Sequence, residues 1–443
     1  MAVRAIESVH AAFASWSRTP AERRVEMLFA VAAILRRRKA EFNAWLIFEA
    51  GKTWVEAEAE TAEASDFCDY YARQMLRWNS PDPLVQLPGE RGLLRYLPLG
   101  VGVIIPPWNF PLAILAGMAV AALVAGNTVV IKPSSDTPTV AAKFVEVLLE
   151  AGFPPESFAF LPGSGAAVGD ILVKHPLTRF VSFTGSRDVG LHVNELAAQH
   201  QPGQRWIKRV IAEMGGKDAI VVDWEADLEA AAQGVVAAAF GYQGQKCSAC
   251  SRVIVDATVY DRFLEMIVAR TARVVIGEPG DPGVNVGPVI NDRARRSILG
   301  YIEKGLKEGR LVAGGGPAPG AGYFIEPTII ADVESTATIF QEEIFGPVLA
   351  VTKARDFEHA LELANDSVYG LTGAVYTANR AKLDAASDRF HVGNLYLNRK
   401  CTGAMVGAHP FGGFNMSGTD SKAGGPDYLL QFLQGKSIAE KIA

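Results

Sequence analysis

The sequence predicts an α/β protein in which a doubly wound, mostly parallel sheet is followed by a second α/β unit. Strand-like and helical runs alternate along the chain, as in sheets whose parallel strands are joined by crossover helices. The chain has 443 residues, of which 49% are hydrophobic, and this is enough to bury the cores of two or three domains.

The first α/β series occupies the first half of the chain. Short runs rich in Val, Ile and Phe alternate with longer Ala- and Leu-rich runs, which predicts strands at 101–105, 128–131, 157–161, 179–183 and 218–222 and helices at 111–125, 137–151, 165–174 and 187–199. Ligands of such sheets bind at the carboxyl ends of the strands. A binding site is therefore expected around the residues at or just after those ends, which are Lys132, Gly163, Gly185 and Glu213.

The second series runs from residue 227 to about 398. It opens with an Ala-rich helix at 227–240, and its strands are expected near 252–255, 324–329, 347–352, 372–376 and 394–398. The segment 84–99 alternates around Pro88 and Gly89, which predicts a hairpin beside the first unit.

Charge and hydropathy exclude several classes of partner. A net charge of −5 gives no electrostatic basis for binding nucleic acid or an anionic membrane. The span 100–131 has no charged residue, but prolines interrupt it and leave 110–126, which is short of the ~20 residues that cross a bilayer. We therefore expect a small-molecule substrate and no membrane or nucleic-acid partner.

Cysteine usage indicates a cytoplasmic protein. The four cysteines are too few and too scattered for a disulfide framework, which indicates a reducing compartment. The N-terminus has no basic segment followed by an apolar one, so no secretory signal is expected.

Cys247 is the candidate nucleophile. It lies on the connection between the helix at 227–240 and a strand, with Lys246 before it and small residues after it. A thiolate is the reactive form, and a nearby Lys or backbone N–H groups would lower the pKa of the thiol. The alternative is a buried structural cysteine, a common role for free Cys.

Two further residues suit the same chemistry. Asn109 lies in a stiff turn rich in Pro and aromatic residues, and its neutral amide is a donor of the kind that an oxyanion site needs. Glu213 lies on a corner followed by Gly215 and Gly216, where its carboxylate could act as a general base.

Other motifs leave alternatives open. Cys247 and Cys250 form a CxxC pair, but no second pair at similar spacing supports a metal site, so none is expected. Cys250 is expected to be a packed small residue, with a disulfide to Cys247 on oxidation as the alternative. The glycines at 163–169 have one spacer too many for the dinucleotide fingerprint and equally suit a turn before a helix. At 183–186 a strand leads into Gly185 and then a helix N-terminus, whose N–H groups could bind a pyrophosphate.

In the order Asn, Glu, Cys, these segments resemble those of the NAD(P)-dependent aldehyde dehydrogenase superfamily. The segments 130–134, 183–186 and 342–347 are similar to its cofactor-site motifs. The segments 245–252, 391–396 and 410–428 resemble one branch, the 1-pyrroline-5-carboxylate (glutamate-γ-semialdehyde) dehydrogenases. The resemblance runs from about residue 1 to the C-terminus. Members of that branch usually carry several tens of residues ahead of the helix that begins here near Val3.

The resemblance implies a doubly wound cofactor domain, a second α/β catalytic domain and a small β oligomerisation flap. It assigns 1–80 and 99–214 to NAD binding, 215–415 to catalysis, and 81–98 with 425–443 to oligomerisation. A homo-oligomer, a dimer or larger, is the implied assembly.

The resemblance also implies a role for each site residue. Cys247 attacks the aldehyde, the Asn109 amide and the Cys247 backbone N–H stabilise the oxyanion, and Glu213 activates water. The implied cofactor residues are Trp108, Lys132 at the adenine ribose, Gly163 at the adenine, Gly185 with Ser186 at the pyrophosphate, Glu343 at the nicotinamide ribose and Phe345 beside its ring.

Specificity rests on a few further positions. The branch holds the substrate carboxylate through Ser248 and the backbone N–H groups of Gly413 and Phe414. Ser135 stands where many strictly NAD-dependent relatives have Glu, so we expect NAD as cofactor with some use of NADP.

The implied function is the oxidation of L-glutamate γ-semialdehyde to L-glutamate in proline degradation, through a cysteine thioester. Three alternatives remain at this point. They are an aldehyde dehydrogenase with a different substrate, a relative that passes the acyl group to coenzyme A, and a cofactor-binding protein without turnover. Glu213 argues against the second, because acyl transfer to a thiol needs no water-activating base.

Overall fold

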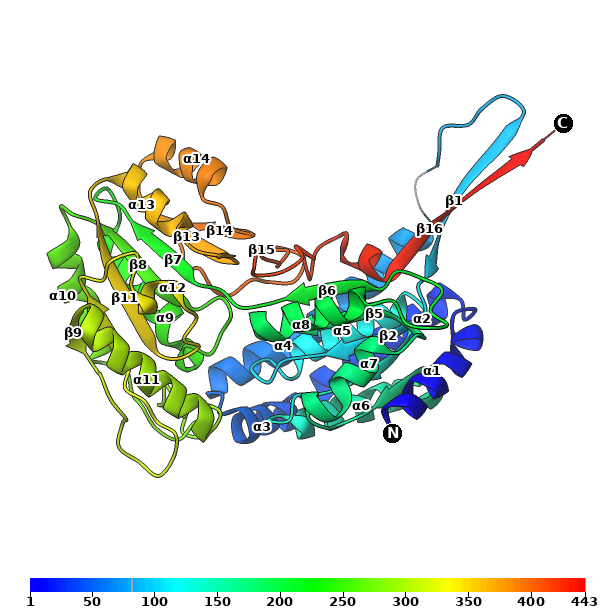
Figure 1. The fold of residues 1–443 in the computed structure, drawn as a ribbon, viewed down its shortest axis with the longest axis horizontal. Coiled ribbons are helices and arrows are strands. Elements are labelled where there is room, and N and C mark those ends of the chain that lie inside the picture. The colour runs from blue at the N-terminus through cyan, green and yellow to red at the C-terminus, as the bar shows by residue number, and fades with distance from the viewer. Residues whose placement is uncertain (81–82, 443) are drawn as a thin grey trace.

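The structure, a computed structural model, describes residues 1–80 and 83–442. The chain forms two lobes, each built around one sheet, and a two-stranded ribbon that projects away from them (Figure 1). The predicted α/β fold class is confirmed.

The first lobe contains a five-stranded sheet with the order β4-β3-β2-β5-β6, in which every neighbouring pair is parallel. Its strands are β2 (Val101–Ile105), β3 (Thr128–Ile131), β4 (Phe158–Phe160), β5 (Thr178–Thr184) and β6 (Arg209–Glu213). Its helices are α1 (Ala2–Trp16), α2 (Ala21–Arg37), α3 (Lys39–Ala50), α4 (Trp54–Asn79), α5 (Ala113–Val124), α6 (Pro138–Glu150), α7 (Asp170–Lys174) and α8 (Arg187–Ala198), with short turns η1 (Pro155–Ser157) and η2 (Gly165–Gly169).

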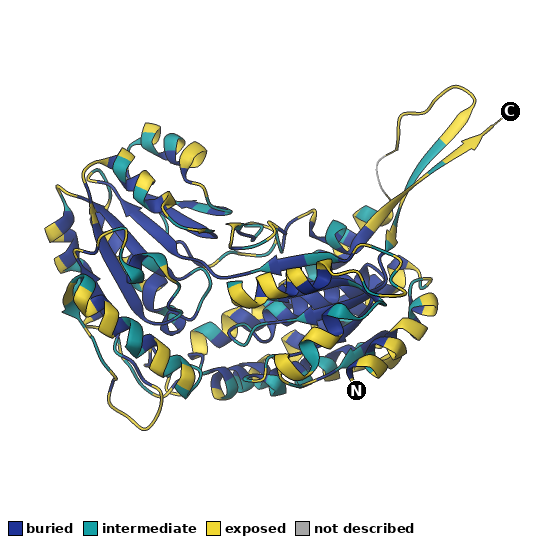
Figure 2. Cartoon of the chain, in the orientation of Figure 1, coloured by how far each residue is buried: buried dark blue, intermediate teal, exposed yellow. Residues whose placement is uncertain are grey.

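Helices cover both faces of this sheet because successive strand residues point to opposite sides. Val101 and Val103 share a core with α1, α7 and α8. Ile104 shares a second core with α2, α3, α4, α5 and α6. Strands β2 and β3 are buried along almost their whole length, which the dark blue of Figure 2 marks. Burial on both faces explains why these strands are apolar without alternation.

The second lobe contains a seven-stranded sheet with the order β14-β13-β7-β8-β11-β10-β9, parallel except for the edge pair β9 and β10. Its strands are β7 (Asp218–Val222), β8 (Cys250–Asp256), β9 (Arg310–Ala313), β10 (Thr328–Ala331), β11 (Val348–Ala354), β13 (Thr372–Tyr376) and β14 (Asn394–Leu397). The covering elements are α9 (Leu228–Phe240), η3 (Gly241–Gly244), α10 (Tyr260–Thr271), α11 (Asp292–Glu308), α12 (Thr338–Gln341), α13 (Phe357–Asn365) and α14 (Arg380–Arg389).

The projecting ribbon corrects the hairpin expected at 84–99. Only β1 (Glu90–Pro98) is a strand, and it pairs antiparallel with β16 (Leu433–Lys441) of the same chain. Residues 84–89 form no strand, and the side-chain amide of Gln86 hydrogen-bonds to the backbone of Gly92. The expected oligomerisation segments 81–98 and 425–443 thus lie partly in this ribbon, while residues 81–82 and 443 fall outside the described residues.

The residues just before β16 are buried, in contrast to the exposed ribbon. In η4 (Tyr428–Phe432), Tyr428 stacks on Tyr71 at 5.3 Å between ring centroids, and Phe432 lies 5.4 Å from Phe180. These residues belong to the core of the first lobe.

Other element predictions also need correction. The strand expected at 218–222 in the first series is β7 of the second sheet, and β6 is the edge strand of the first. The strand expected at 324–329 lies at β10, because Pro327 has no N–H to donate and the strand starts after it. Strand β9 was not expected. The helix expected at 165–174 begins as the π-helical turn η2 before α7.

Two short strands, β12 (Tyr369–Gly370) and β15 (Phe414–Asn415), pair beside the site described below. Within residues 1–80 and 83–442, no helix is long and apolar enough to cross a membrane.

Candidate active site

The three candidate catalytic residues come from three connections that meet between the lobes. Asn109 follows β2, Glu213 ends β6, and Cys247 lies between η3 and β8. The amide Nδ2 of Asn109 donates to the carbonyl oxygen of Gln245, 2.9 Å away and two residues before Cys247. The Glu213 carboxyl acts electrostatically on the Cys247 thiol. The structure therefore brings all three into one site.

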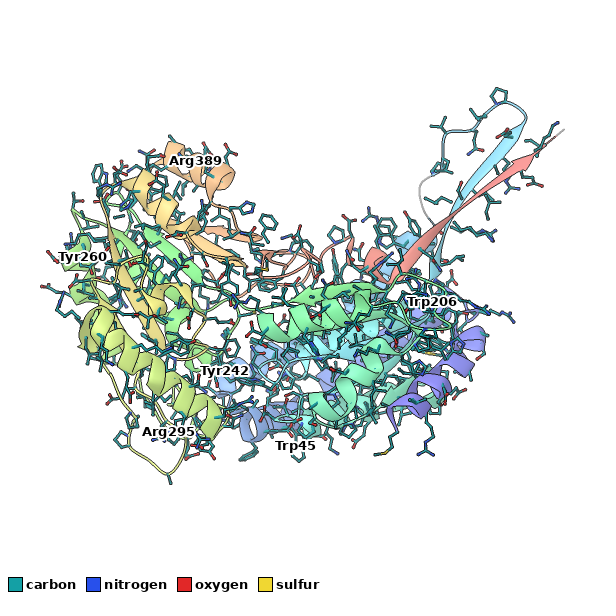
Figure 3. All side chains as sticks on the ribbon, in the orientation of Figure 1. Trp45, Trp206, Tyr242, Tyr260, Arg295 and Arg389 are labelled. Carbon is teal, nitrogen blue, oxygen red and sulfur yellow. The ribbon has the colours of Figure 1, made fainter. Side chains whose placement is uncertain are left out.

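Two side chains of the loop that carries Cys247 bind it to both lobes. Tyr242 and Gln243 have φ of 51° and 56°, in the left-handed region that non-glycine residues rarely adopt. The Tyr242 hydroxyl donates to the carbonyl oxygen of Ala50 at 2.9 Å, and the Gln243 amide donates to that of Pro288 at 2.8 Å. Figure 3 shows Tyr242 between the two lobes. These bonds hold the backbone in an otherwise unfavourable conformation.

The surroundings of Cys247 correct the expected activation of its thiol. The Lys246 ammonium forms an ion pair with Glu56 at 2.9 Å, so its charge is already compensated. Burial raises the pKa of the Cys247 thiol above its usual range, and three neighbouring carboxyl groups raise it further: those of Asp218, Glu343 and Glu213. Of the two expected causes of a lower pKa, a backbone N–H is present, because that of Ser248 acts in this direction, but burial and the carboxyl groups outweigh it.

Glu213 has the properties of a base that works near neutral pH. Burial raises the pKa of its carboxyl to about 7, while hydrogen bonds act in the opposite direction. The Ser421 hydroxyl donates to Oε1 at 2.6 Å, and the Gly413 N–H donates to Oε2 at 3.3 Å. A Cβ on Gly412 would lie 3.0 Å from Oε1, so this carboxyl packs closely against a glycine loop. General bases are most effective with a pKa near the working pH.

The predicted carboxylate-binding residues are only partly free to bind a substrate. The Gly413 N–H, expected to face the substrate, donates to Glu213 here. Phe414 lies in β15, with its ring 5.1 Å from that of His391. Ser248 is half-buried next to Cys247, and its carbonyl oxygen accepts from the Cys401 thiol. The binding role of these residues remains a prediction.

The candidate cofactor residues of the first lobe share one edge of its sheet. Lys132, Gly163 and Gly185 follow the carboxyl ends of β3, β4 and β5. Strands β3 and β4 are neighbours, and β2 lies between β3 and β5. Lys132 is buried, and its Nζ donates to the carbonyl oxygen of Pro133 at 3.0 Å. Ser135 is exposed.

The N-terminus of α8 suits a pyrophosphate. Ser186 precedes the helix and is exposed, and no side chain caps the N–H groups of the first turn. Gly185 next to it donates its N–H to the carbonyl oxygen of Glu213 at 3.1 Å, which ties this turn to the candidate base. Free N–H groups at the start of a twelve-residue helix fit the phosphates of a dinucleotide.

Two predicted cofactor residues of the second lobe lie against this edge. The ring of Phe345 packs edge-on to Trp108 at 5.5 Å, and these aromatic residues come from different lobes. Glu343 accepts the Gly216 N–H at 3.1 Å, and burial raises the pKa of its carboxyl to about 7. A Cβ on Gly215 would lie 2.0 Å from Glu343 Oε2, so a larger residue there would displace this carboxyl group.

Several residues of the site were missed at the sequence level. Ser421 reaches Glu213 from a position 208 residues away, a separation that no local motif reveals. Asp218 opens β7 in full burial, and its Oδ1 accepts the N–H of Thr372 at 2.7 Å. A charged residue at the start of an apolar strand was a signal for it.

The other cysteines have a structural environment. Cys250 is buried, and its thiol lies against the carbonyl oxygen of Arg252 at 3.3 Å. All four cysteines are free. In the described ranges, no group of three or more His, Cys, Asp or Glu side chains is arranged to hold a metal ion.

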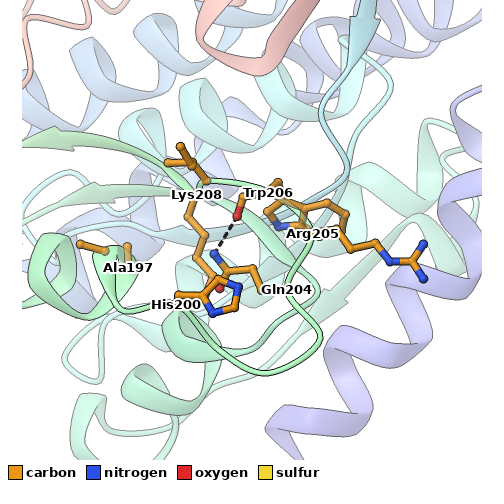
Figure 4. Close-up of a pocket in the computed structure, with 8 residues that line it drawn as sticks. Ala197, His200, Gln204, Arg205, Trp206 and Lys208 are labelled. Carbon is orange, nitrogen blue, oxygen red and sulfur yellow. Dashed lines mark hydrogen bonds between the residues drawn. The ribbon is translucent and has the colours of Figure 1, made fainter.

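A surface hollow lies apart from these residues, at the connection between α8 and β6. It is lined by Ala197, Ala198, His200 and the segment 204–208, with the Gln204 amide donating to the carbonyl oxygen of Trp206 (Figure 4). None of the predicted site residues lines it.

Comparison with known proteins places this geometry in a family. Residues 1–438 match the aldehyde dehydrogenase family model. The 1-pyrroline-5-carboxylate dehydrogenase of Geobacillus thermodenitrificans is 60% identical over 440 residues, which are 99% of this chain and 85% of that protein. A structure of 1-pyrroline-5-carboxylate dehydrogenase from Thermus with bound NAD superposes with a TM-score of 0.98 at 51% identity, covering 99% of this chain and 85% of that one.

A longer protein shares the same fold. Proline utilization A from Bdellovibrio bacteriovorus matches with a TM-score of 0.98 at 45% identity, over 99% of this chain and 46% of that protein. The resemblance seen in the motifs is confirmed, and the chain belongs to the aldehyde dehydrogenase family.

Proposed function

We propose that this protein oxidises L-glutamate γ-semialdehyde, the open form of 1-pyrroline-5-carboxylate, to L-glutamate with NAD. The observation that carries the proposal is the proximity of Cys247 to Glu213, a half-buried base whose pKa is about 7 and whose charge acts on the thiol. A nucleophile and a water-activating base together suit conversion of an aldehyde to a free acid. The names of the relatives supply the substrate.

Cys247 forms the covalent intermediate. Its sulfur attacks the aldehyde carbon, and a thioester results once that carbon has been oxidised. Because the pKa of the thiol is raised, the attacking thiolate is a minority species at neutral pH, and attack should accelerate as the pH rises. Glu213 then takes a proton from water, the water oxygen attacks the thioester carbonyl, and the acid leaves as the Cys247 thiolate is released.

Asn109 stabilises the oxyanion. One N–H of its amide is bound to the Gln245 carbonyl oxygen, which leaves the second N–H to face the oxyanion with the backbone N–H of Cys247. A donor held in place before the reaction needs no reorganisation when charge develops.

NAD binding is assigned to the shared edge of the lobes. Lys132, Gly163, Gly185 and Ser186 would hold the adenosine and pyrophosphate, and Glu343, Phe345 and Trp108 the nicotinamide half. Bound NAD supplies the acceptor for the hydride that leaves the aldehyde carbon. Ser135 presents no carboxylate to a 2′-phosphate, so NADP should be used as well, less efficiently.

The substrate carboxylate is assigned to Ser248 and to the backbone of Gly413 and Phe414. Glutamate semialdehyde carries an α-carboxylate that simple aldehydes lack. The Gly413 N–H donates to Glu213 in this structure, so it would turn to the carboxylate when the substrate binds. Donors that a simple aldehyde leaves unmatched cost roughly 1–3 kcal/mol each, so the natural substrate should exceed butanal or pentanal by at least about a hundredfold in kcat/KM.

The ribbon of β1 and β16 is assigned to oligomerisation. It is largely exposed, and both of its edges are open to further pairing. A homo-oligomer of at least two subunits is the proposed assembly, and the cytoplasm the proposed compartment, since all four cysteines are free. Deleting 433–443 should reduce the mass measured by sedimentation.

The decisive experiment follows NADH formation from 1-pyrroline-5-carboxylate and NAD, with butanal as the comparison substrate and Cys247→Ala as the blank. Glutamate should form without coenzyme A. Equal rates with butanal would contradict the substrate assignment and leave the family intact. A requirement for coenzyme A would favour the acyl-transferring alternative, and NAD binding without any turnover would favour the non-catalytic one.

A further inference from the structure

Lys52 is a buried cation that none of the roles above uses. Its side chain has 0% exposure, and its Nζ lies 3.9 Å from the centre of the Phe110 ring and 3.8 Å from that of Tyr242. The two rings stand edge-on at 6.3 Å, with the ammonium against both. A desolvated cation over two aromatic faces is bound more strongly than an exposed one.

The two rings belong to the two segments that supply the oxyanion donors. Phe110 directly follows Asn109, and Tyr242 lies in η3, on the loop that leads to Cys247. Lys52 itself comes from a third segment, the connection between α3 and α4. It therefore lies where the first-lobe turn and the second-lobe loop approach one another.

Glu60 fixes the other side of the same junction. Its Oε2 lies 3.1 Å from Lys52 Nζ, and its Oε1 accepts the N–H groups of Leu112 and Ala113 at 2.8 and 3.1 Å. These are the first N–H groups of α5, which has no side-chain cap of its own. The pair thus holds the segment that directly follows Asn109 at two points, the Phe110 ring and the start of α5.

We propose that Lys52 is a positioning residue for the oxyanion site, which sets the separation of Asn109 from the Cys247 loop through Phe110 and Tyr242. The inference rests on the proposed roles of Asn109 and Cys247. Without the ammonium, the two rings close on an empty volume or move apart, and the Asn109 amide shifts relative to Cys247.

The test is a double-mutant cycle. Lys52→Met keeps the length of the side chain and removes its charge, but it leaves Glu60 as an unpaired buried carboxylate, which is strongly destabilising. The working variant is therefore Lys52→Met with Glu60→Gln, whose amide oxygen still accepts from the start of α5. We expect kcat to fall by roughly tenfold to a hundredfold, with KM for NAD changed less than about twofold.

Coupling to Asn109 separates positioning from general destabilisation. In an Asn109→Ala background, Lys52→Met with Glu60→Gln should alter kcat by less than about twofold. The reason is that this background lacks the Asn109 amide, which is the group that Lys52 is proposed to position. Lys52→Arg, which keeps a cation between the rings, should recover part of kcat. Lys208→Met is the matched control, because Lys208 is also buried and its Nζ donates to Val173, in the first lobe. It should reduce thermal stability and leave kcat near wild type.

Three results would overturn the proposal: an unchanged kcat in the Lys52→Met, Glu60→Gln variant, an equal fold-loss with and without Asn109, or a loss of kcat in Lys208→Met as large as in that variant. If Asn109→Ala alone keeps full activity, the oxyanion role of Asn109 fails instead, and the two failures are distinct.

Discussion

The Cys247 loop and the N-terminal turn of α8 face the same site but are built differently. In the Cys247 loop, the left-handed residues Tyr242 and Gln243 are held by their own side-chain hydrogen bonds, and the buried Lys52 ammonium lies against the Tyr242 ring. The turn at Ser186 is exposed, and no side chain caps its helix. The turn η2 at Gly165–Gly169 follows β4 at the same edge of the sheet and is exposed or half-buried throughout.

This difference matches the two tasks proposed for the site. Bond formation at a thiol requires atoms held to a fraction of an ångström, and dense packing with hydrogen bonds supplies that. A dinucleotide that leaves after each turnover requires an open surface of N–H groups. Changes in the Cys247 loop should therefore reduce kcat, and changes at the α8 edge should alter the KM for the cofactor.

The largest effect is expected from Cys247→Ala. Removing the thiol removes the bond-forming atom, so turnover should fall by at least about a thousandfold. NAD affinity, measured by fluorescence titration, should stay near wild type, because the proposed cofactor residues lie on other segments. Cys250→Ala is the control and should keep most of the activity, since Cys250 is packed in the second-lobe core. Turnover of Cys247→Ala within tenfold of wild type would remove the nucleophile assignment.

Glu213→Gln should reduce steady turnover by about a hundredfold while a burst of NADH persists. The base acts on the thioester, so the first turnover proceeds and deacylation stalls. In the wild-type enzyme only ionised Glu213 is active, so deacylation should slow as the pH falls below about 7. Rapid-mixing measurements with each variant check both points. Loss of the burst together with turnover would show that Glu213 is needed earlier, to accept the thiol proton.

Local patterns indicated part of the candidate site, because Lys132, Gly185 and Glu213 lie at strand ends bounded by turn residues. The family resemblance, not a local pattern, indicated Glu343 and Phe345. Apolar runs such as 101–105 and 128–131 became β2 and β3. The errors come from contacts between distant segments. Glu56 compensates the charge of Lys246, and Ser421 donates to Glu213. The partner strand of β1 is β16 and not the other half of the expected hairpin. Each of these partners lies far away in the sequence.

The packing difference can be tested with two glycines. A Cβ on Gly216 would lie 2.5 Å from the carbonyl oxygen of Cys247, a backbone atom that cannot move without shifting the loop. Gly216→Ala should lower kcat by at least about tenfold. Gly165→Ala, in η2 at the open edge of the first sheet, is the matched change, because nothing lies within 4 Å of its Cβ, and it should leave kcat within about twofold of wild type. Equal losses from the two substitutions would contradict the proposed contrast.

The smallest effect concerns cofactor choice at the open edge. Ser135 is exposed, three positions beyond Lys132, so a longer side chain there has room to extend toward solvent. Ser135→Glu places a carboxylate where a 2′-phosphate would approach, and like charges repel without disturbing the packed loop. We expect kcat/KM for NADP to fall by about tenfold while that for NAD changes less than about twofold.

Ser135→Gln is the control, because it is similar in size to Ser135→Glu but neutral. It should leave the ratio of kcat/KM for NAD to kcat/KM for NADP near that of the wild type. If Gln lowers NADP use as much as Glu does, bulk and not charge controls the choice, and the assignment of Ser135 to the ribose end of the site would need revision. Because this charge effect acts through solvent, it should weaken as salt is raised, whereas the effect of Gly216→Ala on kcat should not.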